Sequence, residues 1–445
     1  MEKDPPNQTF LTHKKVLIVT YYWPPAGGPG VQRWLKFVKY LPEFGISPVV
    51  CIPSGASYPI EDYSLLKETE GVEILTAAIS EPSRWISWLF KKRTNTLRKG
   101  MINEENPSFL EKLLRAIRGN LFVPDARVSW IKPTTALLKE YLQTQQINTV
   151  ITTGPPHSVH LIGMALKKEL GLCWLADFRD PWTSIGYHKS LFMTTHTQKK
   201  HKKLEAAVLN KADHLIVTSH TTAHEFEILT PNPIHVISNG FEPIQSQLSG
   251  TSNLEKRMKG FSVLHIGSLL SKRNPDILWE CFSELITEEA AFKREFSLHF
   301  VGEVSEQVKD RISAYGLTEF VFYHGYQPHS VCRAFQDLGQ LLLLLEVNSE
   351  DHRGIIPGKL FEYMASNHPI LAIGPEEWEV GAMLEETQSG AVFAYSEKAA
   401  LKAHIFRNFS NYFTGELPCN TQGIERYHRK SLTSKLAKII HGTGH

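Results

Sequence analysis

The first half of the chain alternates short apolar runs with amphipathic segments. Residues 14–20 form an apolar, partly β-branched run that ends shortly before two prolines, which is typical of a buried parallel strand followed by a loop. Apolar side chains then recur at helical spacing over residues 31–41, and residues 47–53 form the next apolar run. This strand–helix–strand order predicts a βαβ unit.

The same alternation continues to about residue 240. Strands are expected in four further stretches, and helices in two of the segments that separate them: strands in 147–156, 173–182, 214–219 and 234–240, helices in 158–171 and 204–213. Strands that alternate with helices in this way predict a doubly wound parallel sheet.

A polar segment over residues 241–260 then interrupts the pattern and is the expected linker. Beyond it the pattern restarts with six apolar runs and closes with an amphipathic helix: 261–269, 296–304, 321–326, 338–347, 369–374 and 391–395, then 426–442. We therefore expect two Rossmann-like α/β domains that face a central cleft, over residues 1–243 and 260–425, followed by a C-terminal helix over 426–445.

The composition narrows the class of protein. A chain of 445 residues is long enough for two α/β domains, and a 42% apolar content argues against general disorder. The formal net charge of +2 gives no overall attraction to nucleic acid, so no nucleic-acid partner is expected.

The cysteines and the apolar runs predict the cellular compartment. The five cysteines are scattered, which fits a reducing cytoplasm and provides neither a zinc knuckle nor a C-x-x-C pair. The first 15 residues lack the apolar core of a secretory signal, and the apolar run that begins at Leu341 is too short to span a bilayer. A cytoplasmic protein is expected, either soluble or peripheral on the membrane.

A glycine-rich loop follows the first strand. The stretch PPAGGPGVQR contains Gly27 and Gly28 between a strand and a helix, where backbone N–H groups can approach an anion. The alternative is an ordinary tight turn. The spacing is not G-x-G-x-x-G, and no acidic residue ends the next strand, which argues against a dinucleotide dehydrogenase.

Charged side chains stand at the ends of two later strands. Asp177, Arg179 and Asp180 follow one strand, and His157 follows another, in the positions where doubly wound sheets bind ligands. The carboxylates could handle protons or form a structural ion pair, and the histidine could be catalytic or part of the core. The pair is not D-x-D, so the usual carboxylate clamp for a metal–diphosphate complex is missing and no metal site is expected.

The second half contains two candidate anion-binding segments. In the first, Arg273 follows Gly267 and a strand, and it either binds a phosphate or is an ordinary solvated charge. In the second, PGKLFEYMA, Lys359 begins a helix and Glu362 lies one turn further on. A lysine at a helix N-terminus can bind a phosphate, and a nearby carboxylate can bind a sugar hydroxyl, which together suit a nucleotide. The alternative is a carboxylate that only stabilises the helix dipole.

One segment suggests contact with a membrane. Residues 83–99 place tryptophan, isoleucine, leucine and phenylalanine beside the basic residues Lys91, Lys92, Arg93, Arg98 and Lys99. Such a segment fits attachment to anionic lipid, or else a helix packed on the domain with a solvated end.

These motifs, in this order along nearly the whole chain, resemble glycosyltransferase family 4 proteins of the GT-B fold. They are YYWPPAGGPGVQR, ADFRDPW, ADHLIVTS with ISNGFEP, GSLLSKRNP and PGKLFEYMAS, and the similarity is greatest to bacterial members that build surface polysaccharide. The resemblance implies a retaining, metal-independent enzyme without a cofactor. It would transfer a sugar from a nucleotide-sugar donor to a hydroxyl of a glycan or lipid-linked acceptor, with the acceptor on the N-terminal domain and the donor on the C-terminal domain.

The resemblance also implies roles for single residues. Glu362 matches the second glutamate of the family's E-x7-E motif and would bind the ribose, and Arg273 matches the donor-phosphate lysine. The expected donor-binding set is Gly27, Gly28, Gly267, Arg273, Gly358, Lys359, Leu360 and Glu362, and the catalytic candidates are Asp177, Asp180 and His157.

The chain departs from the family pattern at two positions. Gly354 replaces the first glutamate of the motif, and Ser268 replaces the first of two phosphate-binding basic residues, for which Lys359 would compensate. A sugar-nucleotide epimerase of the same fold, and a non-catalytic protein that binds sugar nucleotides or lipid, therefore remain as alternatives.

Overall fold

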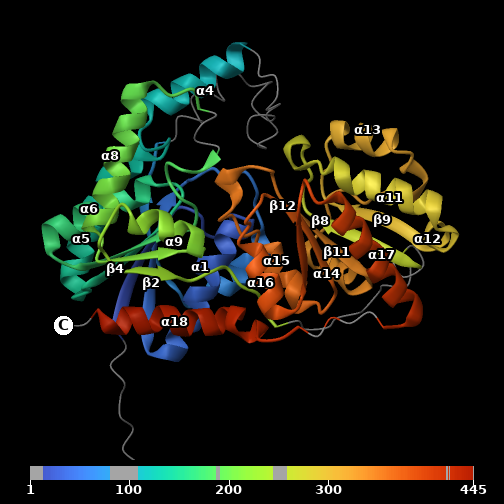
Figure 1. The fold of residues 1–445 in the computed structure, drawn as a ribbon. Coiled ribbons are helices and arrows are strands. Elements are labelled where there is room, and N and C mark those ends of the chain that lie inside the picture. The colour runs from blue at the N-terminus through green and yellow to red at the C-terminus, as the bar shows by residue number, and fades with distance from the viewer. Residues whose placement is uncertain are drawn as a thin grey trace, which may run out of the picture. The chain divides into compact units, whose positions relative to one another are not determined.

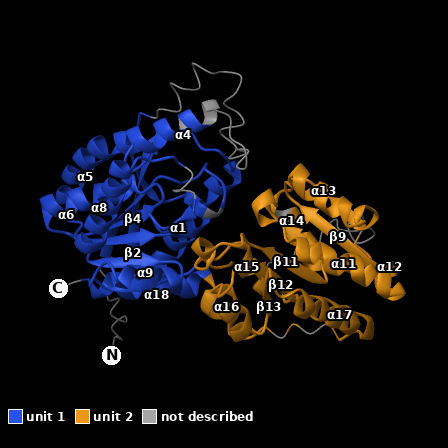
Figure 2. Cartoon of the chain, turned by 45° about the horizontal axis from the view of Figure 1, so that its top comes forward, with its two compact units in different colours: residues 1–238, 429–445 blue, residues 239–428 orange. Residues whose placement is uncertain are grey.

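The computed structural model describes residues 14–80, 109–186, 191–243, 258–416, 419 and 421–443. The chain forms two compact units, shown in Figure 2: unit 1 comprises residues 1–238 and 429–445, and unit 2 comprises residues 239–428. Each unit is an α/β layer structure with helices on both faces of a parallel sheet (Figure 1). The α/β fold class predicted from the alternation of apolar runs and amphipathic segments is confirmed.

Among the described residues, unit 1 contains a seven-stranded sheet with the strand order β3-β2-β1-β4-β5-β6-β7. Its strands are β1 (Lys14–Thr20), β2 (Ile46–Ser54), β3 (Glu73–Ala78), β4 (Thr149–Gly154), β5 (Cys173–Phe178), β6 (His214–Val217) and β7 (Ile234–Val236). β1 pairs in parallel with both β2 and β4. The strand order reverses between β1 and β4, and the loops after these two strands are where such sheets bind ligands.

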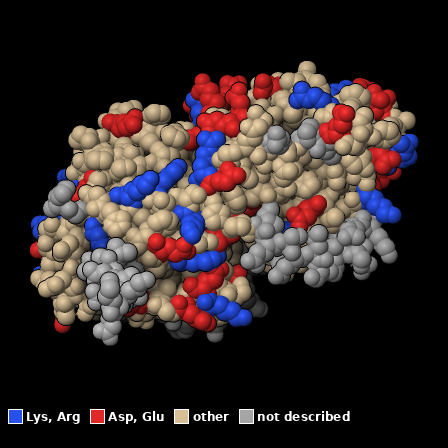
Figure 3. Space-filling model, turned by 90° about the horizontal axis from the view of Figure 1, so that it is seen from below, with Lys and Arg blue, Asp and Glu red and all other residues tan. Residues whose placement is uncertain are grey.

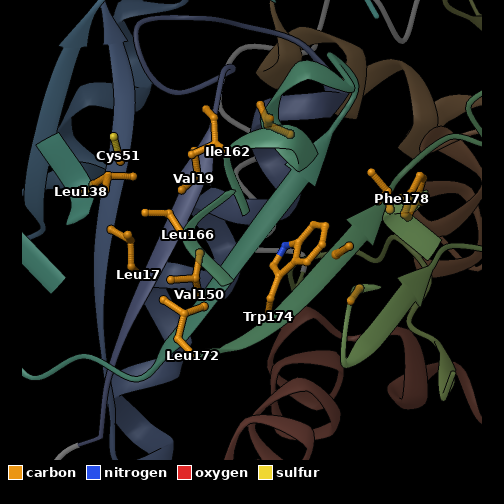
Figure 4. Packing of buried hydrophobic residues seen from close by; sticks show 14 of the residues in the cluster. Leu17, Val19, Cys51, Leu138, Val150, Ile162, Leu166, Leu172, Trp174 and Phe178 are labelled. Atoms are coloured by element: carbon orange, nitrogen blue, oxygen red, sulfur yellow. The ribbon is translucent and has the colours of Figure 1, made fainter. Parts of the chain in front are cut away.

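Helices cover both faces of this sheet. They are α1 (Pro29–Tyr40), α5 (Ile131–Gln145), α6 (Ser158–Leu170), α8 (Thr195–Lys211), α9 (His220–Glu227) and α18 (Arg429–Gly442), and α4 (Phe109–Leu121) is a further helix of unit 1 beyond the end of the sheet (Figure 1). The side chains of β1 alternate between the two faces, as the period of a strand requires. Leu17 and Val19 pack with the side chains of α5 and α6 (Figure 4), whereas Val16 and Ile18 pack with those of α1 and α18.

The amphipathic helix expected at the end of the sequence is present as α18. Its apolar side chains Leu432, Leu436 and Ile440 are buried against unit 1, and Arg429 donates a hydrogen bond to the backbone oxygen of Gln32 at 2.8 Å. The spacing of apolar residues predicts that the helix has a buried face, but it does not say which unit that face packs on.

Unit 2 contains, within its described part, a six-stranded parallel sheet with the order β10-β9-β8-β11-β12-β13. Its strands are β8 (Phe261–Ile266), β9 (Phe296–Val301), β10 (Val321–Tyr323), β11 (Leu341–Leu345), β12 (Ile370–Gly374) and β13 (Gly390–Ala394). Five of these described strands lie within apolar runs predicted as strands, and β13 begins one residue before the predicted run 391–395. The order reverses between β8 and β11, which places a second ligand-binding position after these strands.

The helices of unit 2 are divided between the two faces of its sheet. Those on one face are α11 (Asp276–Glu288), α12 (Ala290–Glu295), α13 (Glu306–Ala314) and α17 (Lys398–Thr414), and those on the other are α14 (His329–Leu338), α15 (Lys359–Ala365) and α16 (Val380–Thr387). The helix predicted after Gly358 is α15. Its residues Leu360, Phe361 and Met364 are fully buried, as the pattern predicted.

Strand β3 does not appear in the sequence prediction. It lies at the edge of the unit 1 sheet, and Ala77 is its one buried residue. A strand with so few buried side chains has no continuous apolar run to mark it.

Two features of the surface bear on partners. Within the described residues, no helix is long and apolar enough to cross a membrane. On the face shown in Figure 3, basic and acidic side chains are intermixed, in keeping with the small net charge.

Candidate functional site

The unit 2 site begins in the loop after β8. Gly267 has a φ of +119°, and a Cβ atom on Gly302 would lie 2.5 Å from the backbone oxygen of Gly267. The loops after β8 and β9 therefore approach more closely than side chains would allow. This approach fixes the backbone at the point where the strand order reverses.

Lys359 extends from the start of α15 to the end of β8. Its Nζ atom donates a hydrogen bond to the backbone oxygen of Ile266 at 3.1 Å and lies 3.4 Å from Nε2 of His265. Burial, and then the positive charge of Arg273, lower the pKa of Lys359 to about 7. The charged form of Lys359 is therefore disfavoured at this position, and a bound anion would stabilise it.

His265 supports this lysine from within β8. Its Nδ1 atom lies 3.1 Å from the backbone oxygen of Leu343, to which it can only donate. Burial, and then Lys359, hold the pKa of His265 well below its usual value, so the ring is neutral and Nε2 faces Lys359 as an acceptor.

Arg273 is fixed by a buried carboxylate. Its Nε atom donates to Oε1 of Glu346 at 3.0 Å, and Glu346, directly after β11, has a side chain that is 1% exposed. Burial alone would raise the pKa of Glu346, but the hydrogen bond from His352 and the charge of Arg273 outweigh it, so the pKa is lowered. A charged arginine and a charged glutamate thus lie next to Lys359, and we call His265, Arg273, Glu346 and Lys359 the unit 2 cluster.

Two other predicted donor-binding residues belong to α15. Glu362 lies one turn into the helix, 28% exposed, with Oε1 3.1 Å from Nε2 of His329. The side chain of Leu360 is fully buried in the core of unit 2, so only its backbone can reach a ligand. α15 has only seven residues, and the positive group at its start is the side chain of Lys359.

In unit 1 the glycine loop is ordered by other parts of the unit. The N–H of Gly27 donates to the backbone oxygen of Ile60 at 2.9 Å, and Gly28, with a φ of +93°, precedes α1 as its N-cap. Arg179 donates to the backbone oxygens of Gly30 and Pro155, at 2.9 and 3.2 Å. Arg179 therefore ties the first turn of α1 to the loop after β4.

Asp177 is completely buried and its oxygens accept several hydrogen bonds. Arg33 donates to Oδ1 at 2.9 Å, and Trp34 and Thr153 donate to Oδ2 at 2.7 and 2.8 Å. Burial would raise the pKa of Asp177, but the charge of Arg33 and these hydrogen bonds lower it. The geometry is that of an ion pair that holds α1 on β5.

Asp180, three residues further on, has a different environment. It is half-buried, and burial raises its pKa, an effect that Arg179 opposes and Asp177 reinforces. A strand-end carboxyl with a raised pKa is a candidate proton acceptor or donor.

His157 lies at the start of α6, where its ring stacks on Trp182 with the ring centroids 4.8 Å apart. It also lines a hollow of about 250 Å³ at the point where the strand order of unit 1 reverses. His157 and Asp180 therefore both follow strands at the ligand-binding edge of the sheet, whereas Asp177 lies inside it.

Sequence reasoning missed three supporting residues, namely His265, Glu346 and Arg33. Glu346 carried a usable signal, because it is an acidic residue directly after five consecutive leucines of a buried strand. His265 and Arg33 carried none, since each looks like one polar residue in an ordinary strand or helix. In the part of the chain that the structure describes, no group of three or more potential ligands could hold a metal ion.

Comparison with known proteins shows the fold. Sucrose-phosphate synthase from Thermosynechococcus elongatus superimposes with a TM-score of 0.62 at 15% identity, covering 96% of this chain and 98% of that chain. Anabaena HepE in complex with UDP-glucose gives 0.62 at 13% identity, with 97% and 100% covered. A putative UDP-N-acetylglucosamine 2-epimerase from Listeria monocytogenes gives 0.55 at 10% identity, with 96% of each chain covered.

No protein-family model matches the sequence, and no curated protein matches it. The likeness to solved structures covers almost the whole of each chain, so the predicted GT-B fold is confirmed.

Proposed function

We propose that the chain is a glycosyltransferase that moves a sugar from a nucleotide-sugar donor to an acceptor hydroxyl. The observation that carries the proposal is the unit 2 cluster, which brings Lys359 of α15 and Arg273 together near the end of β8. Glu362 lies one helical turn from Lys359. Phosphate oxygens suit the two cations, and ribose hydroxyls suit the carboxylate. The fold is shared with HepE, which was solved with UDP-glucose, and this supports a nucleotide-sugar partner.

In this proposal, unit 2 makes the diphosphate a good leaving group. Lys359 and Arg273 donate hydrogen bonds to the phosphate oxygens as negative charge develops on them. Removing one such preorganised donor costs roughly 3–4 kcal/mol in other active sites. Because these side chains supply positive charge, the proposed transfer is metal-independent. The proposal also includes retention of configuration, which the resemblance implies. The backbone of residues 355–358 replaces the side chain that Gly354 lacks.

Unit 1 binds the acceptor in this proposal. Asp180 or His157 orients the acceptor hydroxyl, and Asp180 is the stronger candidate for taking its proton, because burial raises its pKa and so makes it a stronger base than an ordinary aspartate. Asp177 acts only by positioning α1, through Arg33. The resemblance assigns donor phosphate binding to the loop with Gly27 and Gly28, and this role stays a prediction, since the N–H of Gly27 already donates to Ile60.

A thermal-shift panel of nucleotide sugars tests the proposal. A ligand that binds only the folded protein stabilises it by an amount that grows with the ratio of its concentration to its dissociation constant. We expect the nucleoside diphosphate of one base to stabilise the protein clearly, and one nucleotide sugar with that base to stabilise it further. A panel covering the common bases and hexoses that gives no shift at millimolar concentration would contradict the proposal.

Replacing Glu362 by alanine should weaken binding of a nucleoside diphosphate about tenfold, because hydrogen bonds to a charged group contribute roughly 1.5–3 kcal/mol. Binding of inorganic diphosphate should stay unchanged, since that ligand has no ribose. The matched control is Glu385→Ala, an exposed glutamate on α16. Equal losses for nucleoside diphosphate and inorganic diphosphate would rule out the ribose contact.

An epimerase is the second candidate, favoured by the Listeria structure of the same fold, whereas Gly354 favours the non-catalytic alternative. Incubation with the preferred nucleotide sugar and no acceptor distinguishes the two. An epimerase produces the epimeric nucleotide sugar, whereas a transferase produces only slow hydrolysis. A protein that binds the donor without any turnover, even with a natural acceptor, would instead fit the non-catalytic alternative.

We also propose that the protein acts in the cytoplasm as a peripheral membrane protein. The segment first suggested for lipid contact, residues 83–99, lies outside the described residues. Support comes from α4, where Leu113, Ile117 and Leu121 are exposed at a spacing of four residues and lie among basic side chains. An exposed apolar stripe with basic neighbours fits the surface of an anionic bilayer.

Changing these three α4 residues to glutamate should reduce binding to phosphatidylglycerol vesicles at least about tenfold, because it removes apolar contact and adds negative charge. Co-sedimentation measures the effect. Leu137→Glu, at another exposed leucine of unit 1, is the control and should bind as the unchanged protein does. Equal binding by the triple variant would exclude α4 as a lipid-facing element.

A further inference from the structure

The hollow in unit 1 lies where the strand order reverses, between the loops that follow β1 and β4. It has a volume of about 250 Å³. Tyr22 follows β1 and residues 155–157 follow β4; His201 comes from α8, Leu191 precedes that helix, and residues 118, 119, 122 and 124–127 come from the end of α4 and its following loop. Since pockets for drug-sized ligands reach roughly 300–1,000 Å³, this hollow suits one sugar ring or one anionic group.

The charged lining of the hollow is predominantly basic. Arg118 and Arg127 contribute two guanidinium groups, and Asp125 is the one acidic residue in the lining. The Asp125 carboxylate is already engaged by backbone, because Oδ1 accepts from the N–H of Arg127 and Oδ2 from the N–H of Ser158, both at 2.8 Å. Asp125 therefore shapes the loop and caps α6, and the lining keeps a net positive charge.

Arg127 is held in place. Its guanidinium lies 4.8 Å from the centroid of the Tyr21 ring, and Nη2 is 3.3 Å from the Tyr21 hydroxyl. A guanidinium stacked on an aromatic ring keeps its hydrogen-bond donors in one plane, which suits the oxygens of a phosphate. The second guanidinium, that of Arg118, is on an exposed side chain at the end of α4.

His201 adds a hydrogen-bond donor of fixed orientation. Nδ1 of His201 accepts a hydrogen bond from Nε1 of Trp182 at 3.1 Å. Burial, and then Lys200, lower the pKa of His201, so the ring is neutral and carries its proton on Nε2. The remaining lining is mainly apolar and aromatic, with Tyr22, Phe122 and Pro124 among it, which suits the apolar face of a sugar ring.

We propose that this hollow binds a phosphate group of the acceptor, so that the acceptor is a phosphorylated saccharide. Arg118 and Arg127 bind the phosphate oxygens, and the apolar wall packs against the adjoining sugar ring. A phosphate is favoured over a carboxylate because two guanidinium groups match its charge and its number of oxygens. The inference rests on the proposed function, since it names the acceptor class of that reaction.

The phosphorylated saccharide could be one of two kinds of molecule, a soluble sugar phosphate or the sugar-diphosphate end of a lipid carrier. The experiment therefore titrates the full-length protein with a hexose, its 1- and 6-phosphates, a hexuronic acid and inorganic phosphate. A second arm uses a polyprenyl diphosphate sugar in detergent micelles, with empty micelles as the blank. Donor binding is measured on every sample by the same calorimetric method.

We expect a phosphorylated ligand from one arm to bind at least about tenfold more tightly than the hexose. Arg118→Gln and Arg127→Gln should each remove about tenfold of that preference, the size of one lost charge-assisted contact. Lys132→Gln, at an exposed lysine of α5, makes the same charge change and should have no effect. Arg127→Lys keeps the charge and the fold but should restore only part of the affinity.

Several results would overturn the inference: equal binding of phosphorylated and free hexose, tighter binding of the uronic acid, no binding in either arm, or arginine variants that bind as the unchanged protein does. Arg118 is exposed, so Arg118→Gln keeps the test valid even where Arg127→Gln fails to fold. If the unsubstituted protein binds no nucleotide-sugar donor, the proposed function is contradicted instead, whatever ligand the hollow binds.

Discussion

Replacing Lys359 by methionine should weaken nucleotide-sugar binding about 10- to 100-fold while making the unliganded protein more stable. Hydrogen bonds to charged groups contribute roughly 1.5–3 kcal/mol, and the diphosphate would lose one of its two cations. Turnover should fall further, by about 10²–10³, if Lys359 also stabilises the leaving group. A residue that merely stabilises the fold could not produce both results.

The stability change follows from the pKa of Lys359, which is about 7 in the folded protein and 10.5 as its ordinary value. Folding therefore disfavours the charged form, so the wild-type protein loses stability as the pH falls from 10.5 to 7, and the loss is complete below pH 7. Lys359→Met removes this cost. We expect a gain of about 1–3 kcal/mol at pH 6, discounted because the side chain is partly exposed, and no gain above pH 10.5.

Ligand binding should show the opposite dependence on pH. A bound phosphate raises the pKa of Lys359, so binding takes up a proton above pH 7. Affinity should then fall with rising pH by up to about tenfold per unit between pH 7 and the pKa of the complex. Calorimetry from pH 6 to 9 measures this slope, and Lys293→Met, at an exposed lysine of α12, is the control. An identical slope in Lys359→Met would assign the proton to another group.

Asp177→Asn and Asp180→Asn should give opposite results, although the residues are three positions apart. Asp177→Asn leaves the buried guanidinium of Arg33 without its counter-charge, and breaking a buried pair in this way costs about 3–5 kcal/mol. Asp180→Asn removes a carboxylate that burial disfavours, so it should leave stability unchanged or raise it at neutral pH. It should also lower kcat while donor affinity stays the same.

Denaturation with urea and steady-state kinetics measure both outcomes, and each variant is the control for the other. The pH dependence has opposite signs as well. The pKa of Asp177 is lowered, so its stabilisation is present above its ordinary value of 3.8 and is lost as the pH falls through the folded pKa. The pKa of Asp180 is raised, so its ionisation costs stability as the pH rises above 3.8. A stable Asp177→Asn with reduced kcat would make Asp177 the catalytic residue instead.

Much of the fold follows from local pattern, because buried parallel strands are continuous apolar runs that end in glycine or proline. Strands β8, β9 and β12 carry such a run, whereas β3 does not, since it lies at a sheet edge with one buried side chain. The packing of α18 on unit 1 depends on contacts with α1, about 400 residues earlier in the sequence. No local pattern contains that information.

The candidate site likewise contains some residues that a local motif predicts and others that only the fold brings together. Lys359 and Glu362 belong to one short motif, and their place near a strand end follows from the order of the elements. The pairing of Arg273 with Glu346 spans 73 positions and two strands that are neighbours only in the folded sheet. The sequence likewise places Asp177 and Asp180 together, and only the partners that the fold gives Asp177, namely Arg33, Trp34 and Thr153, separate the structural carboxylate from the one with a raised pKa.

The most direct test of the central claim is a crystal structure with the nucleotide sugar that the thermal-shift panel selects. The account predicts the diphosphate at the unit 2 cluster, with phosphate oxygens within hydrogen-bond distance of Nζ of Lys359 and of the Arg273 guanidinium. A well-ordered nucleotide sugar bound elsewhere, with Lys359 still bonded only to the backbone of Ile266, would contradict it.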